Sequence, residues 1–230
     1  MRYFQRQPLD AAIQNQLLIK TTTNFGSLTD AQRSDIVSKL ITSQKSLCAY
    51  CECEISPIEY HIEHFEEQHD APNRVFDYTN FVLSCEGNRD PASRPESATD
   101  ARYRRSNISC GHRKTKGHHG NIEIDYSLLL NPTTEGVATL FSYFDGVVES
   151  RRSCTLEEKK QVDYTIKRLK LDTHRLENNR IQKMRDIREI LKSMTEEEKK
   201  EFIRDLLDES QSVLHPYFST IKDNFGFMLL

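Results

Sequence analysis

The sequence predicts an α+β fold, with helices at both ends of the chain and short strands between them. Helix-capping residues and apolar residues at helical spacing occur before residue 46 and after residue 153. Between these limits lie short β-prone segments, turn residues and five of the six cysteines. A chain of 230 residues is long enough for one domain with a long extension, or for two modest domains.

The composition is typical of a globular protein. Hydrophobic residues make up 37% and charged residues 29% of the chain, and no apolar run approaches the roughly 20 residues that span a bilayer. The first 20 residues lack a basic region followed by an apolar stretch, so we expect no signal peptide. We therefore expect a cytoplasmic protein without membrane contact, in which reduced cysteines favour a metal site over disulfides.

The first region, residues 1–46, is predicted to be helical. Thr29 can N-cap a helix, Gln32 three residues later completes a capping box, and apolar residues recur at helical spacing after it. This helix should run to about Gln44 and lead directly into Cys48.

The second region, residues 47–120, contains two short strand-like segments, Tyr60–Phe65 and Asp77–Ser84. Arg89–Asn107 is rich in Ser, Pro, Asp and Arg and is predicted to be a loop or insertion, whereas Cys110–Lys116 could begin a helix.

The third region, residues 121–152, should be extended. Ile122–Leu130 is apolar, and Thr139–Ser150 resembles a β-hairpin around the turn dipeptide Asp145-Gly146. The fourth region, residues 153–230, is predicted to be helical, with helices through about Leu171, from Thr173 to Met194, and through about Glu209. The first and third of these helices have capping boxes, formed by Thr155 with Glu158 and by Thr195 with Glu198.

Two cysteines, Cys48 and Cys51, have the two-residue gap of a zinc knuckle. This gap lets two thiolates on one tight turn reach a single tetrahedral ion at about 2.3 Å. Cys85 and Cys110 are the natural second pair, although 24 residues separate them. The sequence therefore predicts a structural zinc ion bound by Cys48, Cys51, Cys85 and Cys110.

Other interpretations of the cysteines are weaker. A redox dithiol would follow a strand and open a helix in a βαβ unit, and that pattern is absent. Cys53 competes with Cys51 as a ligand, and Cys154 lies in the helical half of the chain. We expect Cys53 and Cys154 to be free buried thiols.

Basic residues gather in one stretch although the net charge is only −3. Between Ala101 and His119 there are six Lys or Arg and no acid, a pattern typical of a phosphate-binding face or, alternatively, of a solvated loop. The residues that we expect to contact nucleic acid are Arg102, Arg104, Arg105, Arg113, Lys114 and Lys116.

The segment Tyr60–Phe65 carries two histidines and a glutamate. Alternation along a strand would point Glu63 and His64 to opposite faces, unless a following turn brings both to one site. The segment could be a surface strand with satisfied polar residues. A zinc deaminase is a poor alternative, because His61-x-Glu63 matches its first motif but the Pro-Cys-x-x-Cys motif is missing.

A third interpretation combines this segment with the cysteines. The chain contains, in order, Cys48-x-x-Cys51, Glu63-His64, Asn80 to Cys85, and Cys110-Gly-His112. In this order the elements resemble the HNH, or ββα-metal, endonucleases, which implies such a core with a structural zinc ion and flanking helices. Within that family the chain is similar to PtuB of Septu-type and retron-associated anti-phage systems, over about residues 1 to 195.

The resemblance implies roles for the site residues. His64 would deprotonate the attacking water, because imidazole titrates near neutral pH. Glu63 would bind a catalytic divalent ion, Mg²⁺ or Mn²⁺, and Asn80 would hold the loop and orient His64. The last ligand of this ion is open between His112 and Asn88.

The resemblance also implies DNA as substrate and, as partner, an ABC/SMC-like ATPase subunit similar to PtuA. The alternative is a zinc-stapled nucleic-acid-binding or adaptor module with a degenerate nuclease site. The presence of Glu63, His64 and Asn80 together favours the enzyme.

Overall fold

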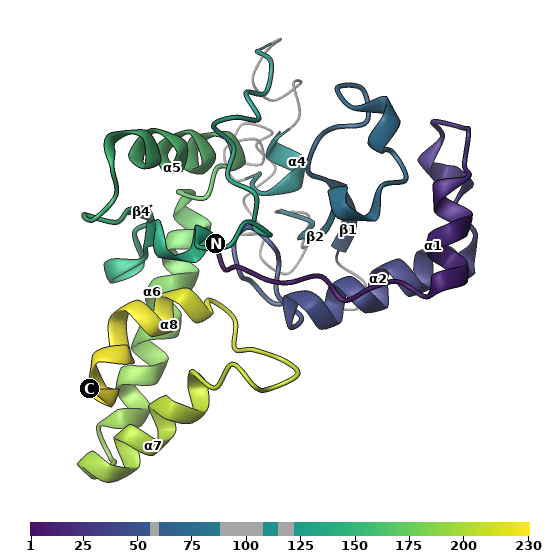
Figure 1. Cartoon of the computed structure of the whole chain (residues 1–230). Coiled ribbons are helices and arrows are strands. Elements are labelled where there is room, and N and C mark those ends of the chain that lie inside the picture. Colours follow the sequence, from purple (N-terminus) through teal and green to yellow (C-terminus); the bar gives the residue numbers. More distant parts are fainter. Residues whose placement is uncertain (56–59, 88–107, 115–121) are drawn as a thin grey trace, which may run out of the picture.

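The computed structural model describes residues 1–55, 60–87, 108–114 and 122–230. Helices and two small sheets make up the fold, so the predicted α+β class is confirmed. A two-stranded hairpin lies between the helix that precedes it and a short helix that follows it, and a long helix leads away toward the C-terminal helices (Figure 1). In the described part of the chain, no helix is long and apolar enough to cross a membrane.

The N-terminal region contains α1 (Ala11–Leu18), a 3-10 turn η1 (Phe25–Ser27) and α2 (Asp30–Gln44). The predicted capping box is present at α2, where Thr29 Oγ1 accepts from Gln32 N–H and Gln32 Oε1 accepts from Thr29 N–H. Helix α1 was not predicted. Its N-cap, Asp10, is a clear local signal, but the helix is short and buries only Leu17.

The last residue of α2, Gln44, fastens this helix to the hairpin. Its side-chain amide donates to Leu83 O (2.9 Å) and Leu47 O (2.8 Å), and its Oε1 accepts the Leu83 N–H (2.7 Å). The Gln44 side chain therefore satisfies one edge of the second strand of the hairpin, as a neighbouring strand would.

The hairpin consists of β1 (Tyr60–His64) and β2 (Phe81–Cys85), antiparallel, with His64 opposite Phe81. The connection contains η2 (Pro72–Arg74) and η3 (Tyr78–Asn80). Strand β2 is completely buried. The short helix α4 (Gly111–Lys114) follows, and it packs on α5 (Leu156–Leu169).

Residues 122–130 do not form the predicted extended strand. The Leu130 N–H donates to Thr165 Oγ1 (2.9 Å) and the Asp125 N–H to Tyr164 Oη (2.8 Å), both on α5. Side chains of α5 therefore satisfy this backbone, and it needs no partner strand.

The hairpin predicted at residues 139–150 is present as β3 (Phe141–Ser142) and β4 (Glu149–Ser150), preceded by η6 (Val137–Thr139). Its strands are shorter than predicted, because the turn η7 (Phe144–Gly146) occupies the middle.

The C-terminal helices are α5, α6 (His174–Leu191), α7 (Glu196–Leu206), α8 (Phe218–Phe225) and the turn η8 (Gly226–Leu229). Both predicted capping boxes, at Thr155 and Thr195, are formed. Helix α8 lies within the region predicted to be helical, beyond the last helix whose bounds were predicted there.

Two main hydrophobic cores organise the chain. The larger joins the N-terminal segment, α2, the β1–β2 hairpin, β3, α5 and the start of α6, and includes Leu40, Leu83, Phe141 and Leu169. The smaller lies between the second half of α6 and helices α7 and α8. The hairpin is thus held in the larger core.

We expect replacement of Gln44 by Leu to destabilise the protein by about 1–3 kcal/mol, because the buried Leu83 N–H loses its acceptor. Urea unfolding followed by circular dichroism measures this loss. The matched control is Gln182→Leu on the exposed face of α6, which should change stability by less than about 0.5 kcal/mol. Equal losses in both variants would contradict the role of Gln44.

Candidate functional site

Four cysteine thiols meet at the start of the hairpin. The sulfur atoms of Cys48, Cys51, Cys53 and Cys85 lie within 4.8 Å of one another. The Cys51 and Cys85 sulfurs are 3.7 Å apart, and two ligands at about 2.3 Å from one tetrahedral ion are separated by about this distance. The cluster could therefore bind zinc.

The turn that carries three of these thiols is tight. Cys48 N–H donates to Cys53 O (2.9 Å), Glu52 N–H donates to Cys48 O (3.1 Å), and Glu52 has a positive φ of 62°. Cys85 N–H donates to the Cys48 sulfur (3.4 Å), which ties the turn to the end of β2.

Cys110 faces the same cluster from the residue before α4. Its thiol interacts with those of Cys48, Cys51 and Cys85, and hydrogen bonding with it is the largest cause of the lowered pKa of Cys51. Cys53, expected to be a free thiol, instead lies within the cluster. Cys154 is buried apart from it, against Leu140 O.

Two guanidinium groups lie beside the cysteines, that of Arg175 partly buried and that of Arg180 buried. Arg175 donates to Ser109 Oγ (2.8 Å) and Gly87 O, and Arg180, only 1% exposed, donates to Leu171 O (3.1 Å). Burial lowers the pKa of both, whereas the neighbouring thiols raise it. Four thiolates around one Zn²⁺ carry a net charge of about −2, which these cations would offset. The surroundings therefore suit a thiolate-bound metal.

The imidazole ring of His64, at the end of β1, is held by aromatic packing and by a hydrogen bond from one ring nitrogen to the main chain. Its ring packs edge-on against Phe25 and Phe81, and its Nε2 lies 2.9 Å from Val75 O. A carbonyl oxygen only accepts, so Nε2 carries the hydrogen and Nδ1 carries the lone pair in the neutral ring. Burial lowers the pKa of His64, which favours that neutral ring at neutral pH. Gln68 Nε2 approaches Nδ1 at 3.5 Å.

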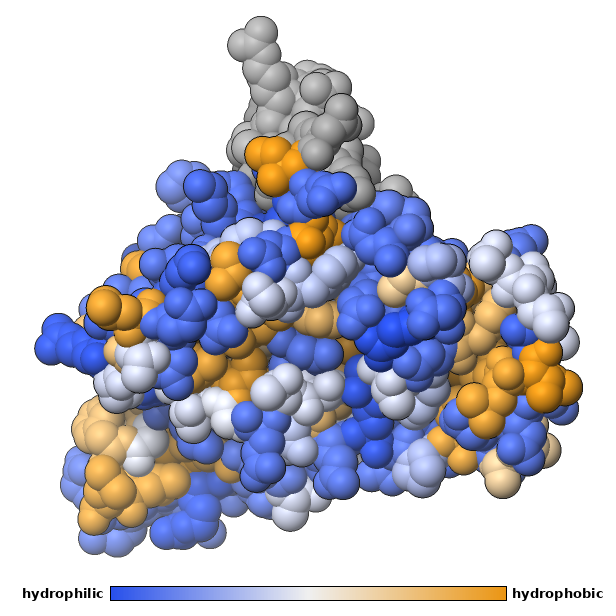
Figure 2. All heavy atoms as spheres, turned by 45° about the horizontal axis from the view of Figure 1, so that its top comes forward, coloured by the Kyte–Doolittle hydropathy of each residue, from blue (hydrophilic) through white to orange (hydrophobic). Residues whose placement is uncertain are grey.

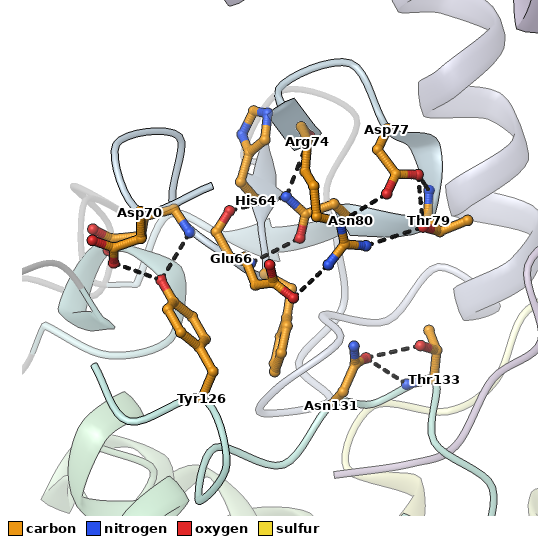
Figure 3. A network of polar contacts seen from close by, with 12 residues as sticks. His64, Glu66, Asp70, Arg74, Asp77, Thr79, Asn80, Tyr126, Asn131 and Thr133 are labelled. Atoms are coloured by element: carbon orange, nitrogen blue, oxygen red, sulfur yellow. Dashed lines mark hydrogen bonds and ion pairs between the residues drawn. The ribbon is translucent and has the colours of Figure 1, made fainter. Parts of the chain in front are cut away.

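Asn80 fastens the loop that follows His64 (Figure 3). Its Oδ1 accepts the Glu66 N–H (2.8 Å), and its Nδ2 donates to Glu66 O (2.9 Å) and to Arg74 O (3.4 Å). Asn80 is 1% exposed, and all of these bonds are to the main chain. This amide therefore fixes the backbone on which Val75 O, the partner of His64, is presented.

The same loop is secured by two further side chains (Figure 3). Arg74 binds Glu66, Asp77 (2.8 Å) and Thr79 (3.1 Å). Tyr126 accepts from Glu67 N–H and donates to Asp70, both at 2.9 Å, and so connects the loop to the segment 122–130.

Glu63 forms a buried ion pair with Lys114 of α4. The Lys114 ammonium also donates to His64 O and Phe65 O (2.9 Å), and His61 Nε2 lies 3.2 Å from Glu63 Oε2. Burial alone would raise the pKa of Glu63, but Lys114 and His61 lower it to about 2. Glu63 is therefore ionised.

Lys114 does not face solvent. It is 0% exposed, and its ammonium group is surrounded by the Glu63 carboxylate and two main-chain oxygens. The expectation that Lys114 contacts phosphate is therefore wrong, because this cation is used inside the protein.

A second group of potential ligands lies beside Glu63. His61, Glu86 and His112 each offer a ligand atom within 4.8 Å of the others. His112 Nε2 is 3.0 Å from Glu86 Oε2, His61 Nδ1 is 3.5 Å from Glu86 Oε1, and the two rings stack at 4.1 Å. The structure thus brings His112 together with two residues that were not selected from the sequence.

Glu63 and His64 share a pocket despite their alternation along β1. The pocket encloses about 260 Å³ and is lined by Ile62, Glu63, His64, Glu67, Gln68 and His69. The turn after Phe65 closes it, so the condition for bringing both residues to one site is met.

Other expected site residues are placed as follows. Arg113 is partly exposed on α4. The remaining ones lie outside the described residues: Asn88, Arg102, Arg104, Arg105 and Lys116.

The residues missed from the sequence are His61 and Glu86, together with Gln68 near His64. The two-residue periodicity of a strand could have indicated His61, because it places His61 on the face of Glu63. No local pattern marks Glu86, which reaches the site because β2 pairs with β1 in the observed register.

Comparison with known proteins finds a relative among the nucleases. No family model matches the chain. Over 159 residues, or 67% of its length, the chain is 27% identical to a protein of Vibrio cholerae serotype O1 biovar El Tor named "Retron Vc95 putative HNH endonuclease". The match spans 66% of that protein.

We expect Lys114→Met to destabilise the protein by about 3–5 kcal/mol, because the buried Glu63 carboxylate loses its main counter-charge. The double variant Glu63→Gln/Lys114→Met should recover much of this loss. Thermal and urea unfolding measure both, with Lys160→Met on the surface of α5 as control. If the second change recovers nothing, the ion pair is not the cause.

Proposed function

We propose that this chain is a metal-dependent HNH endonuclease that cleaves DNA phosphodiester bonds. The observation that carries the proposal is the state of His64, whose Nε2 is fixed on Val75 O while Nδ1 is left as a base beside the pocket that Glu63 also lines. The motif order and the name of the Vibrio cholerae relative support the same activity.

In the proposed reaction, His64 acts as the base and Asn80 orients it. His64 Nδ1 takes the proton of the attacking water, and the bond from Nε2 to Val75 O stabilises the resulting imidazolium. Asn80 holds the loop that presents Val75 O and so orients the base. A bound divalent ion, Mg²⁺ or Mn²⁺, would supply charge stabilisation at the phosphate and the leaving oxygen.

The ligands of that ion are proposed from the residues near Glu63. The resemblance assigns Glu63 together with His112 or Asn88 to it. His112 lies in the described group with Glu86, whereas Glu63 is already paired with Lys114. Phosphate contacts fall to Arg113 and to the basic residues Arg102, Arg104, Arg105 and Lys116, which would position DNA without reading its sequence.

For the zinc ion we propose the ligands Cys48, Cys51, Cys85 and Cys110. These four residues come from the turn before β1, the end of β2 and the start of α4. One ion would thus hold together the three elements that carry the site. Cys53 is the competing fourth ligand, since it lies among the same thiols.

By resemblance we further propose that the nuclease acts in a retron-associated or Septu-type anti-phage system with an ABC/SMC-like ATPase. The surface offers apolar side chains for such a partner. Orange patches gather over α1 and over the C-terminal segment (Figure 2), where Leu18, Ile19 and Phe227 are 72%, 77% and 68% exposed.

A second candidate is a zinc-stapled nucleic-acid-binding or adaptor module without catalysis. The ion pair between Lys114 and Glu63 favours it, because a carboxylate neutralised by an ammonium is a poor direct ligand for a metal ion. Catalysis would then require the ion to bind elsewhere or Lys114 to move.

The nuclease proposal is tested by plasmid cleavage with Mg²⁺ or Mn²⁺, with and without the ATPase. We expect His64→Ala to lower the cleavage rate by about 100-fold or more, because the general base is lost. His174→Ala, an exposed histidine at the start of α6, is the control. Equal cleavage by wild type and His64→Ala in every condition would exclude His64 as the base.

The pH dependence distinguishes a base from a structural histidine. Burial lowers the pKa of His64, so the neutral form persists below the ordinary value of 6.5 and protonates only at lower pH. The cleavage rate should therefore stay constant as pH falls to about 6.5 and decline below that value. A decline centred above that value would contradict the assignment.

Zinc analysis tests the cysteine site. We expect about one zinc per chain in protein purified without chelator, and loss of both zinc and folding in Cys48→Ser, because structural zinc is coupled to folding. Cys110→Ser should lose zinc, whereas Cys53→Ser should keep it. The opposite result for these two variants would assign Cys53 as the ligand.

A further inference from the structure

We propose that His61, Glu86 and His112 bind a divalent transition-metal ion, Mn²⁺ or Zn²⁺, with Glu63 as the outer partner that orients His61. This ion is separate from the one held by cysteines. Its catalytic use rests on the proposed nuclease function, but its binding does not.

The three ligand atoms already have the spacing of a metal site. His112 Nε2 and His61 Nδ1 lie 3.0 Å and 3.5 Å from the two oxygens of Glu86, and all three residues fit within 4.8 Å. Ligands at about 2.0–2.2 Å from one ion stand about 3 to 4 Å apart. An ion can therefore enter with only small side-chain movements.

The tautomer of His61 favours a metal at Nδ1. Its Nε2 lies 3.2 Å from Oε2 of the Glu63 carboxylate, whose other oxygen is paired with Lys114, so Nε2 is the donor and carries the hydrogen. In the neutral ring, Nδ1 then has only its lone pair, is buried, and makes no hydrogen bond. Facing it at 3.5 Å is a carboxylate oxygen of Glu86, so a metal ion between these two atoms would be bound by both.

Glu63 has the position of an outer partner. Metal-bound histidines commonly donate their second N–H to a carboxylate, which fixes the ring and strengthens the ligand. The Glu63–His61 pair has this arrangement, and Lys114 neutralises the carboxylate on its other oxygen. The direct ligands are therefore His61 and Glu86, in place of Glu63.

Gly111 lets α4 approach this arrangement. A Cβ atom at Gly111 would lie 2.7 Å from both Glu63 Oε2 and His61 Nε2, too close for any side chain. Glycine at the start of α4 therefore lets His112, one residue later, lie beside the Glu63–His61 pair without displacing it.

The donor set selects the kind of ion. Two imidazole nitrogens and one carboxylate suit Mn²⁺, Zn²⁺ and similar ions, whereas Mg²⁺ prefers oxygen ligands. Three protein ligands also leave coordination positions for water or a phosphate oxygen, as in catalytic metal sites.

Metal binding itself is the test. Full-length protein that holds one equivalent of zinc per chain is titrated with Mn²⁺ and followed by electron paramagnetic resonance and calorimetry. We expect about one Mn²⁺ per chain beyond the cysteine-bound zinc, with binding weakened at least about tenfold in His61→Ala and in Glu86→Gln. His69→Ala, in the other His-carboxylate group of the described residues, should bind as wild type does. Circular dichroism confirms that each variant is folded.

The double variant Glu63→Gln/Lys114→Met separates an outer partner from a direct ligand. An outer role predicts retained binding, weakened by about 10- to 100-fold. Unchanged binding in His61→Ala, or complete loss in the double variant with His61→Ala unaffected, would overturn the proposal. Mn²⁺ binding that depends on His61, without DNA cleavage either alone or with the ATPase, would leave this site standing and defeat the nuclease function instead.

Discussion

The buried ammonium group of Lys114 is the interaction on which the arrangement of the site depends. It binds Glu63, His64 O and Phe65 O, so a single cation joins α4 to the end of β1. The main chain of Lys114 is held in turn by Arg168 of α5, whose Nε donates to Lys114 O (3.0 Å). This connection places α4 beside the strand that carries His61, Glu63 and His64.

The cysteine cluster and the Lys114 pair act at opposite ends of the short β1–β2–α4 unit. The cysteines gather at the open end of the hairpin, where Cys85 ends β2 and Cys110 precedes α4. Each of these sites has positively charged side chains next to its acidic groups. Arg175 and Arg180 lie beside the thiols, and Lys114 lies beside Glu63. A unit of two five-residue strands and one turn of helix has little hydrophobic area of its own, so these polar connections set its geometry.

Local signals in the sequence predicted the parts of this structure that depend on neighbouring residues. The capping boxes at Thr29, Thr155 and Thr195 each involve residues three apart, and all three are present. The extended segment at 122–130 was predicted wrongly, because its backbone is satisfied by Thr165 and Tyr164, which no local pattern reveals.

In the candidate site, too, residues in local sequence motifs were predicted, whereas residues placed by tertiary contacts were not. The short spacing of Cys48 and Cys51 indicated a metal turn, and the order of motifs indicated Glu63, His64 and Asn80. Charge pattern alone assigned Lys114 to phosphate, because a sequence does not show which lysine is buried. Glu86 was missed because strand register, set by tertiary packing, brings it to His61.

Glu63 connects the two halves of the site. Along β1, His61 and Glu63 point to one face and His64 to the other, yet Glu63 also lines the pocket of His64 where the strand ends. Glu63 bonds to His61 on one side and stands next to the base on the other. Its negative charge raises the pKa of His64 against the effect of burial, whereas the Lys114 charge lowers it. A metal ion bound at His61 would, like Lys114, lower the pKa of His64. A bound ion would therefore favour the neutral imidazole, which is the form that accepts a proton.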